Sequence, residues 1–392
     1  MKFKSGDEKN LFGKSSLQPV AAAMLTRGTK TMTRSEIEDR MTELKMAGSI
    51  TNFTTTRKNL PAALELVFDV MHNSIMPQDE FDQFKKQMQV MIESMRDKPD
   101  ALAQNAITQH FNTYPKGDPR HEYSLDESLE QLNRLTVDQV RAFYKEFGGT
   151  SRGEISIVGD FDPKAVEKII RDDYAKYVSK AHYAPIVTEY RPVQATRVVI
   201  DTPDKENATI VARSVFPIND TAPDAPALTV ANWILGGGTG LSNRLIERLR
   251  QKEGLSYGAG SHVRIPAKGD NGSFVFRAIV APQNMLQAEA SARDVIAKAI
   301  KDGFTDQEVE EAKKGLLQAM QVARSQDDVV ARSWNDKMEN QRTWVFSKKQ
   351  AEAISKLTTA DVNAALRKYI KPDEITFVLA GDQKKAAQKK QD

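Results

Sequence analysis

Two side chains in the second half of this 392-residue chain have the types and the spacing to act together on a peptide carbonyl. Arg250 stands near the end of an expected helix, and Tyr257 follows seven residues later, beyond Gly254. A guanidinium presents fixed, forked donors to a carbonyl oxygen, and a phenol hydroxyl stabilises an oxyanion as its charge develops. On residue types alone, a helix-end arginine and an edge-strand tyrosine without a catalytic role are the simpler interpretation.

The residues predict no metal cofactor in this chain. It has five histidines and no cysteine, and no two histidines have the i, i+4 spacing that places both on one helical face. His121-Glu122 begins like H-E-x-x-H, but Leu125 stands where the second histidine belongs. Without cysteine, thiolate catalysis and disulfides are excluded. Serine nucleophiles also lack support, because the sequence has no G-x-S-x-G turn.

A glycine run, 236–240, precedes the Arg250 region and invites comparison with phosphate-binding loops. It lacks the Gly-Lys-Ser/Thr of a P-loop, and Leu241 replaces the third glycine of a dinucleotide fingerprint. Residues 225–235 also predict a helix, whereas both motifs need a strand there. We therefore expect the run to be a helix end that leads into the next helix. A second pattern, Met88, Met91 and Met95 along one helical face, is typical of core packing.

Composition limits the classes of partner. The chain has 56 basic and 53 acidic residues, a net charge of +3, which is too balanced to predict a nucleic-acid surface. No apolar run approaches the roughly 18–20 residues of a membrane span, and residues 1–9 lack the apolar stretch of a signal peptide. The length predicts more than one domain.

The two halves of the chain show a weak internal duplication. Leu135-Thr136 recurs as Leu357-Thr358, and Lys85-Lys86 recurs as Lys313-Lys314. Further matches follow the same order, at offsets between 210 and 228, as loop insertions would cause. Each half then closes on a strand-like run, at 154–158 and at 374–378.

Local signals predict alternating helices and strands in each half. Capping boxes, Thr33 with Glu36 and Thr136 with Gln139, predict helix starts. A long amphipathic helix is expected over 79–96, and residues 261–265 and 273–280 predict a hairpin. We expect an α+β protein of two similar domains, residues 1–184 and 185–392, each a mixed β-sheet with helices packed on one face.

The run from Leu249 to Tyr257, with residues 241–245 before it, resembles the C-terminal-domain signature of the pitrilysin/insulinase metallopeptidase family. The first half is similar to it in residues 24–30 and 158–162, so the resemblance covers about residues 15 to 382. It implies the mitochondrial-processing-peptidase-like, or LuxS-like, metallohydrolase fold for each domain.

The family's zinc motif is the inverted H-x-x-E-H, just before M-L-x-x-G-T. Aligned on Met24-Leu25, its two histidines fall on Pro19 and Ala23 and its glutamate on Ala22. None of these side chains can bind zinc or activate water. The family's further acidic ligand would fall near Glu93, which cannot hold a metal alone.

The resemblance therefore implies the inactive half, or non-catalytic subunit, of a zinc metallopeptidase, which has no peptidase activity alone. Arg250 would grip a substrate carbonyl and Tyr257 would steady the tetrahedral intermediate, while a partner half with H-x-x-E-H supplies zinc. Whether that partner is covalently joined or forms a heterodimer stays open. The alternatives are a purely structural subunit of the same fold, as in core proteins of respiratory complexes, and a cofactor-maturation partner. The compartment also stays open, with a periplasmic setting compatible because many bacterial relatives are exported.

Overall fold

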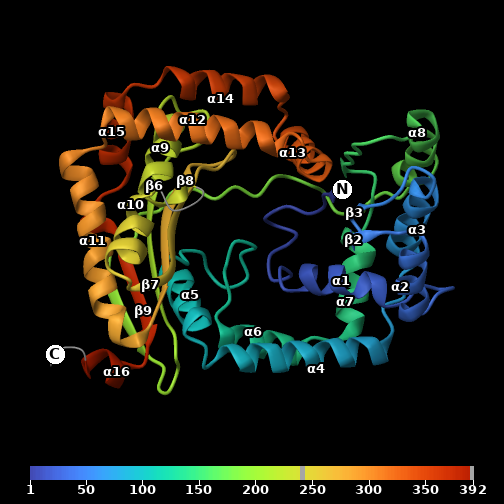
Figure 1. The fold of residues 1–392 in the computed structure, drawn as a ribbon. Coiled ribbons are helices and arrows are strands. Elements are labelled where there is room, and N and C mark those ends of the chain that lie inside the picture. The colour runs from blue at the N-terminus through green and yellow to red at the C-terminus, as the bar shows by residue number, and fades with distance from the viewer. Residues whose placement is uncertain (239–242, 389–392) are drawn as a thin grey trace.

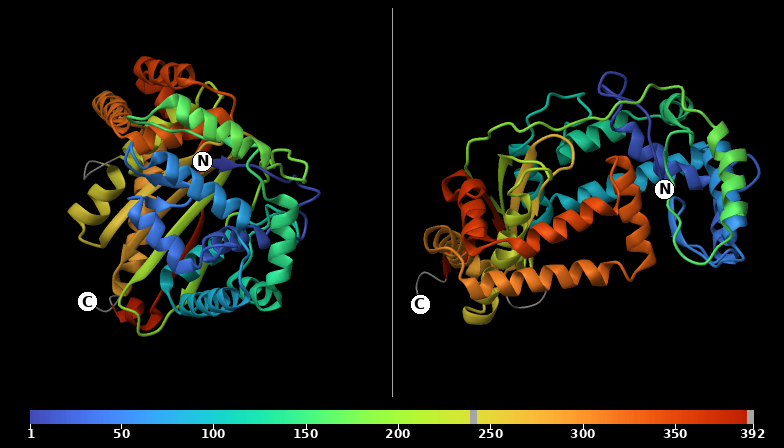
Figure 2. Two further views of the ribbon diagram at one scale, coloured as in Figure 1. Left: turned by 90° about the vertical axis from the view of Figure 1, so that its right-hand side faces the viewer. Right: turned by 90° about the horizontal axis from the view of Figure 1, so that it is seen from above.

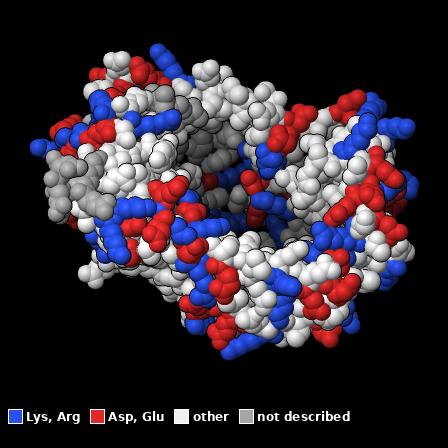
Figure 3. Space-filling model, turned by 60° about the horizontal axis from the view of Figure 1, so that its bottom comes forward, with Lys and Arg blue, Asp and Glu red and all other residues white. Residues whose placement is uncertain are grey.

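The computed structural model describes residues 1–238 and 243–388. Residues 239–242, which include the end of the glycine run, and the tail residues 389–392 lie outside this description. The chain forms two halves that enclose a central hollow, visible between them in the space-filling view (Figure 3). On the face shown there, basic and acidic side chains are interspersed. Within the described residues, no helix has the length and apolar character needed to cross a bilayer.

The second half is built on one five-stranded mixed sheet. Its strands are β5 (Arg197–Asp201), β6 (Ala208–Pro217), β7 (Ser256–Arg264), β8 (Asn271–Val280) and β9 (Thr376–Gly381). The order is β5-β9-β6-β8-β7, with β5 parallel to β9 and every other neighbouring pair antiparallel. The predicted hairpin is confirmed as β7 and β8, although β7 begins at Ser256, earlier than expected. The α+β class expected from the sequence is confirmed.

Helices cover one face of this sheet, as expected. The helices of the second half are α9 (Ala225–Asn232), α10 (Arg244–Ile246), α11 (Met285–Asp302), α12 (Asp306–Ala323), α13 (Asp327–Glu339), α14 (Trp344–Lys356), α15 (Thr359–Tyr369) and α16 (Gln383–Gln388), of which α13 lies away from the sheet and reaches toward the first half. Short helical turns are η3 (Trp233–Gly237), η4 (Glu247–Lys252), η5 (Pro282–Asn284) and η6 (Pro372–Glu374). The inward residues of β6 and β8, such as Ile210 and Phe276, form one large core with α9, α11 and α15.

The first half is mainly helical. Its helices are α1 (Leu17–Met24), α2 (Arg34–Glu43), α3 (Leu60–Asn73), α4 (Gln78–Met95), α5 (Pro99–His110), α6 (Leu125–Arg134), α7 (Val137–Phe147) and α8 (Pro163–Asp172), with short turns η1 (Leu25–Arg27) and η2 (Tyr174–Lys176). Both predicted capping boxes are present, at the starts of α2 and α7.

The sheet of the first half is smaller than the sequence predicted. Strand β1 (Lys2–Phe3) pairs with β4 (Gly153–Glu154), and β2 (Ala47–Ser49) pairs with β3 (Asn52–Thr54), as two separate two-stranded sheets. The expected strand at 154–158 pairs only at its start, because β1 supplies a partner of just two residues.

Helix bounds reproduce the internal duplication. The first residues of α4 and α12 are separated by the same number of residues as their last residues. The same holds for α7 and α15, so each pair of helices has the same length and a constant offset. Side-chain contacts repeat as well. The Lys85 ammonium donates to the Leu135 carbonyl at 3.0 Å, and the Lys313 ammonium donates to the Leu357 carbonyl at 2.9 Å. The lysines that match in the sequence thus make an equivalent hydrogen bond in each half. One bond joins α4 to the residue before α7, and the other joins α12 to the residue before α15.

Helix α5 joins the two halves. It follows α4 in the first half of the sequence, yet it packs on the open face of the second-half sheet, against β6 and β9 (Figures 1 and 2). Ala103 and Ile107 of α5 are fully buried there against Val211, Val378 and Ala380. The sheet is therefore covered on both faces, by its own helices and by a helix from the other half.

The methionine pattern is core only in part. Met88 packs against the first-half core, as predicted, but Met91 is 42% exposed, so its assignment to the core was wrong. Met91 follows the exposed Val90, because α4 buries one narrow stripe that includes Phe81, Phe84 and Ile92.

We predict that Ile107→Ala lowers the free energy of unfolding by about 3 kcal/mol, because it opens a cavity between α5 and the sheet. Chemical denaturation followed by circular dichroism measures this loss. The matched control is Ile75→Ala, at a side chain that is 44% exposed, which should change stability by less than about 0.5 kcal/mol. Equal effects of the two substitutions would contradict the role given to α5.

Candidate functional site

One tightly closed turn carries both Arg250 and Tyr257. It runs from η4 into β7, and the Leu255 N–H donates to the Leu249 carbonyl at 2.8 Å. Both leucine side chains are buried in the second-half core. Gly254 adopts a φ of 61°, the left-handed conformation that favours glycine. The buried side chains of Leu249 and Leu255 thus hold the turn in place, and Arg250 and Tyr257 lie at its two ends.

The backbone around this turn is of an uncommon kind. Both η3 and η4 are π-helical, a conformation that occurs in well under 1% of residues and often at functional sites. A side chain at Gly236 would lie 2.5 Å from Ser261 Oγ and 2.7 Å from a Leu245 methyl group. Gly236 therefore lets η3 approach β7 closely, so the described part of the glycine run, 236–238, is a helix end, as the sequence predicted.

Arg250 is the cation of η4 that lacks a partner among the described residues. Its neighbours are paired: Arg248 lies 2.5 Å from Glu253, and Lys252 lies 2.8 Å from Glu247. Arg250 is exposed, and no hydrogen bond or ion pair engages its guanidinium in the described part of the chain. Its forked donors are therefore available to a ligand.

Tyr257 is the extra residue of a β-bulge. The pairing of β7 with β8 shifts between Ser256 and Gly258, and Tyr257, 68% exposed, has no partner across the ladder. The buried Ser256 hydroxyl accepts the Gly258 N–H at 3.1 Å and lies 3.0 Å from the Ile279 carbonyl, which fixes the bulge. Bulges re-aim side chains and are common beside active sites. Since β7 is an edge strand, the tyrosine faces solvent at the rim of the sheet.

Arg244 secures the segment that leads into η4. Its guanidinium makes two hydrogen bonds to the Glu308 carboxylate of α12, at 2.7 and 2.8 Å, and one to the Gly303 carbonyl at 3.0 Å. Burial alone would raise the pKa of Glu308, but the hydrogen bonds from Arg244 and Thr305 outweigh it and hold that pKa below its usual range. The pair stays charged at neutral pH and fastens α10 to α12.

The positions to which the resemblance assigns the zinc motif lie elsewhere, on α1 in the first half (Figure 1). Pro19, Ala22 and Ala23 share the exposed face of that helix, opposite its buried residues Val20, Ala21 and Met24. A zinc ion, which the resemblance implies for catalysis, does not fit here, because these three side chains offer no donor atom. Glu93 is exposed on α4 and paired with Arg96 at 3.0 Å. Among the described residues, no group of three histidine or acidic side chains could hold a metal.

The structure thus brings Arg250 and Tyr257 to the two ends of one turn, while Pro19, Ala22 and Ala23 belong to the other half. Sequence reasoning missed the supports of this turn, above all Ser256 and the Arg244–Glu308 pair. Arg244 lies within the signature but carried no signal of its partner, which is 64 residues away.

Comparisons with known proteins agree with the fold. Residues 134–316 match the family model described as the peptidase M16 inactive domain. An uncharacterised zinc protease of Mycobacterium tuberculosis is 25% identical over 261 residues, which are 66% of this chain and 57% of that protein. The chain therefore spans less than two thirds of the length of this relative.

Solved structures show the same fold over nearly the whole chain. A peptidase M16 inactive domain from Pseudomonas fluorescens superposes with a TM-score of 0.80 at 20% identity, covering 97% of this chain and 91% of that one. The periplasmic protease PqqL of Escherichia coli gives a TM-score of 0.66 at 14% identity, covering 96% of this chain but only 42% of PqqL.

A match to an inactive domain fits a chain whose described residues include no group of three potential metal ligands. The sequence signature, the family-model match over residues 134–316 and the shared fold together make this chain similar to the inactive domain of M16 peptidases.

Proposed function

We propose that this chain binds peptide substrate and completes the active site of a partner half or subunit that carries H-x-x-E-H and zinc. The observation that carries the proposal is one turn, held by buried leucines, that bears the bulged, exposed Tyr257 and an Arg250 guanidinium with no hydrogen bond or ion pair among the described residues. Neighbouring cations are neutralised by carboxylates, and this one is left for a ligand.

The chemistry divides between the halves. A zinc ion in the partner would polarise the scissile carbonyl and activate water. On this chain, Arg250 would hold a substrate carbonyl by its forked donors, and the Tyr257 hydroxyl would donate to the oxyanion of the tetrahedral intermediate. Because buried contacts fix the turn beforehand, these donors need little reorganisation when charge develops.

The match to PqqL supports a two-half arrangement. This chain covers 42% of that protease, about the share that one of two similar halves would have. That comparison supports the proposal of a catalytic partner, either joined to this chain or separate.

We expect the purified chain to bind no stoichiometric zinc, because Pro19, Ala22 and Ala23 provide no ligand. Elemental analysis after dialysis against zinc-containing and then zinc-free buffer tests this. One tightly held zinc ion per chain would show that another set of ligands exists and that the division of roles is wrong.

The central test is peptide cleavage by the zinc-bearing partner half, alone and mixed with this chain. We expect activity to rise in the mixture, and Arg250→Ala to lower the kcat of the mixture by about 10²-fold or more, as loss of an oxyanion-type donor does. The matched control is Lys252→Ala, which removes an ion-paired cation from the same turn and should leave kcat unchanged. No increase over the partner alone would favour the structural-subunit alternative.

We expect Tyr257→Phe to lower the kcat of the mixture by about 10-fold or more while KM changes little, because the phenol would donate mainly in the transition state. Tyr190→Phe, which removes a hydroxyl far from the turn in the sequence, serves as the control. If Tyr257→Phe instead raised KM at constant kcat, Tyr257 would contribute only to substrate binding.

A further inference from the structure

The open face of the second-half sheet carries basic side chains beside the area that α5 covers. Helix α5 packs over β6 and β9, whereas β8 and β7 continue this face to the edge of the sheet. Val275 of β8 packs in the small core beneath α5 and so marks the open face. His262 of β7 pairs directly with Val275, and directly paired residues have their side chains on the same face. His262 is exposed there, and so is Arg264, two residues further along the strand.

Arg213 of β6 extends this basic group toward the middle of the sheet. It also pairs with Val275, so its side chain lies on the open face. Its guanidinium lies over the ring of Phe111 at 4.8 Å, and its Nε is buried without a hydrogen-bond partner. No ion pair engages this half-buried guanidinium within the part of the chain that the structure describes. Because a buried cation without a counter-ion is costly, Arg213 would gain from a carboxylate.

The charged groups around Arg213 leave an excess of positive charge. Burial lowers the pKa of Arg213 and the charge of Arg264 lowers it further, whereas the charge of Glu122 raises it. Arg264 has no ion-pair partner among the described residues. Glu122 is exposed and, in the same part of the chain, forms no ion pair with either arginine. Two guanidinium groups and the imidazole of His262 thus stand against one carboxylate.

Strand β7 leads from Tyr257 to this basic group. Between Tyr257 and His262, the open face of β7 carries Gly258 and Gly260, which have no side chain to obstruct a ligand. A Cβ added at Gly258 would meet no described atom within 4 Å, so the surface is open there. A strand rises about 3.3 Å per residue, so Arg264 lies roughly 20 Å along β7 from Tyr257, a distance that an extended peptide spans with about six or seven residues.

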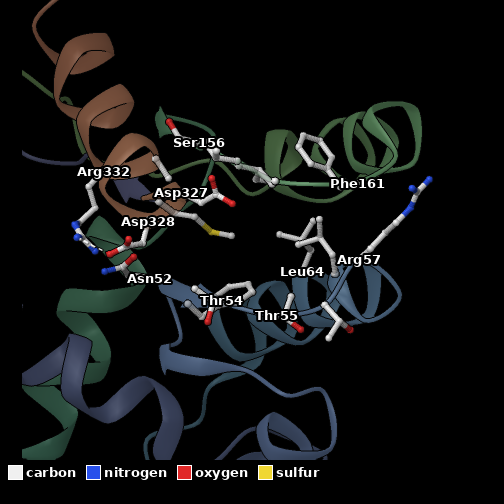
Figure 4. Close-up of a pocket in the computed structure, with 18 of the residues that line it drawn as sticks. Asn52, Thr54, Thr55, Arg57, Leu64, Ser156, Phe161, Asp327, Asp328 and Arg332 are labelled. Atoms are coloured by element: carbon white, nitrogen blue, oxygen red, sulfur yellow. Dashed lines mark ion pairs between the residues drawn. The ribbon is translucent and has the colours of Figure 1, made fainter. Parts of the chain in front are cut away.

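A second space between the halves has the opposite charge. It is a pocket of about 470 Å³ that lies between residues 51–57, residues 156–161 and α13 (Figure 4). Helix α13 contributes Asp328, which pairs with Arg332 at 2.7 Å, and the exposed Asp327, which has no ion pair among the described residues. A carboxylate would be repelled by Asp327, so an acidic ligand group favours the basic sheet face over this pocket.

We propose that Arg213, His262 and Arg264 form a subsite for an acidic side chain of the peptide substrate, about six or seven residues from the carbonyl held at the turn of Arg250 and Tyr257. The forked donors of a guanidinium match the geometry of a carboxylate, and the carboxylate supplies the counter-ion that Arg213 lacks. A basic side chain at the same position would add a like charge and bind less well. This inference rests on the proposed function, because it takes the turn to hold the substrate.

Peptide binding to the purified chain tests the subsite without a catalytic partner. The probes are acetylated and amidated peptides of about twelve residues, long enough to reach from the turn to the subsite. They consist of alanine, serine and threonine, with one glutamate, glutamine or lysine near either end. In isothermal titration calorimetry we expect the best glutamate peptide to bind about 10-fold more tightly than its glutamine counterpart, and the lysine peptide to bind more weakly than both. Equal affinities, or no binding of any probe, would overturn the proposal.

Charge variants locate the preference on the sheet face. Arg264→Glu should make the lysine peptide bind about 10-fold more tightly than the glutamate peptide, and Glu122→Gln should tighten glutamate binding by about 3-fold. The matched control is Lys298→Glu on α11, which changes the net charge by the same amount behind the covered face of the sheet. It should leave the order of affinities unchanged. A reversal by Lys298→Glu as well would overturn the proposal, because net charge alone would then set the preference.

Cleavage in the mixture with the zinc-bearing partner separates this inference from the proposed function. We expect kcat/KM to be about 10-fold higher for the glutamate peptide than for the glutamine peptide, and Arg264→Glu to remove this difference. If the chain raises cleavage of both peptides equally, the subsite is wrong and the proposed function stands. If the chain binds the glutamate peptide preferentially but does not raise cleavage, the subsite stands and the proteolytic role is wrong.

Discussion

Packing of α5 on the second-half sheet is the contact on which the rest of the molecule depends. Ala103 and Ile107 are buried against β6 and β9, so a helix from the first half closes the face that the second half leaves open. The free energy gained by burying apolar area in this contact outweighs the entropy lost when the two halves are held together. It sets the spacing between the halves and thus the hollow seen between them (Figure 3).

Because the two halves are similar, the contact of α5 can be compared with the contact that its counterpart makes. Helix α13 is the counterpart of α5 and reaches toward the first half, but its contacts there are polar. Asn335 accepts a hydrogen bond from the Ser156 hydroxyl at 2.7 Å, and Lys2 bonds to Glu339 at 3.0 Å and to Asp336. Exposed ion pairs such as those of Lys2 contribute little individually to stability. The two contacts between the halves therefore differ: α5 packs in an apolar core, whereas α13 makes polar contacts.

The candidate site belongs to the well-packed half. Leu249 and Leu255 anchor its turn in the large core, and Arg244 fastens the preceding helix to α12. Exposed side chains on a rigid support suit a substrate-binding role, because little freedom is lost when a ligand binds. In the first half, by contrast, the positions on α1 to which the resemblance assigns the zinc motif, Pro19, Ala22 and Ala23, offer no side-chain atom that could bind a metal.

The sequence by itself determined the resemblance to the family, the α+β class, many helix starts and the lack of a zinc-binding atom at Pro19, Ala22 and Ala23. These follow from local chemistry: Thr136 with Gln139 is a cap wherever it lies, and Pro19 and Ala23 have no donor in any fold. Only the tertiary structure decided that Arg250 has no ion-pair partner among the described residues, that Tyr257 lies in a bulge, and that α5 crosses to the other sheet. Each depends on partners far away in the sequence, and their pairing is fixed by packing of whole elements, which local patterns do not encode.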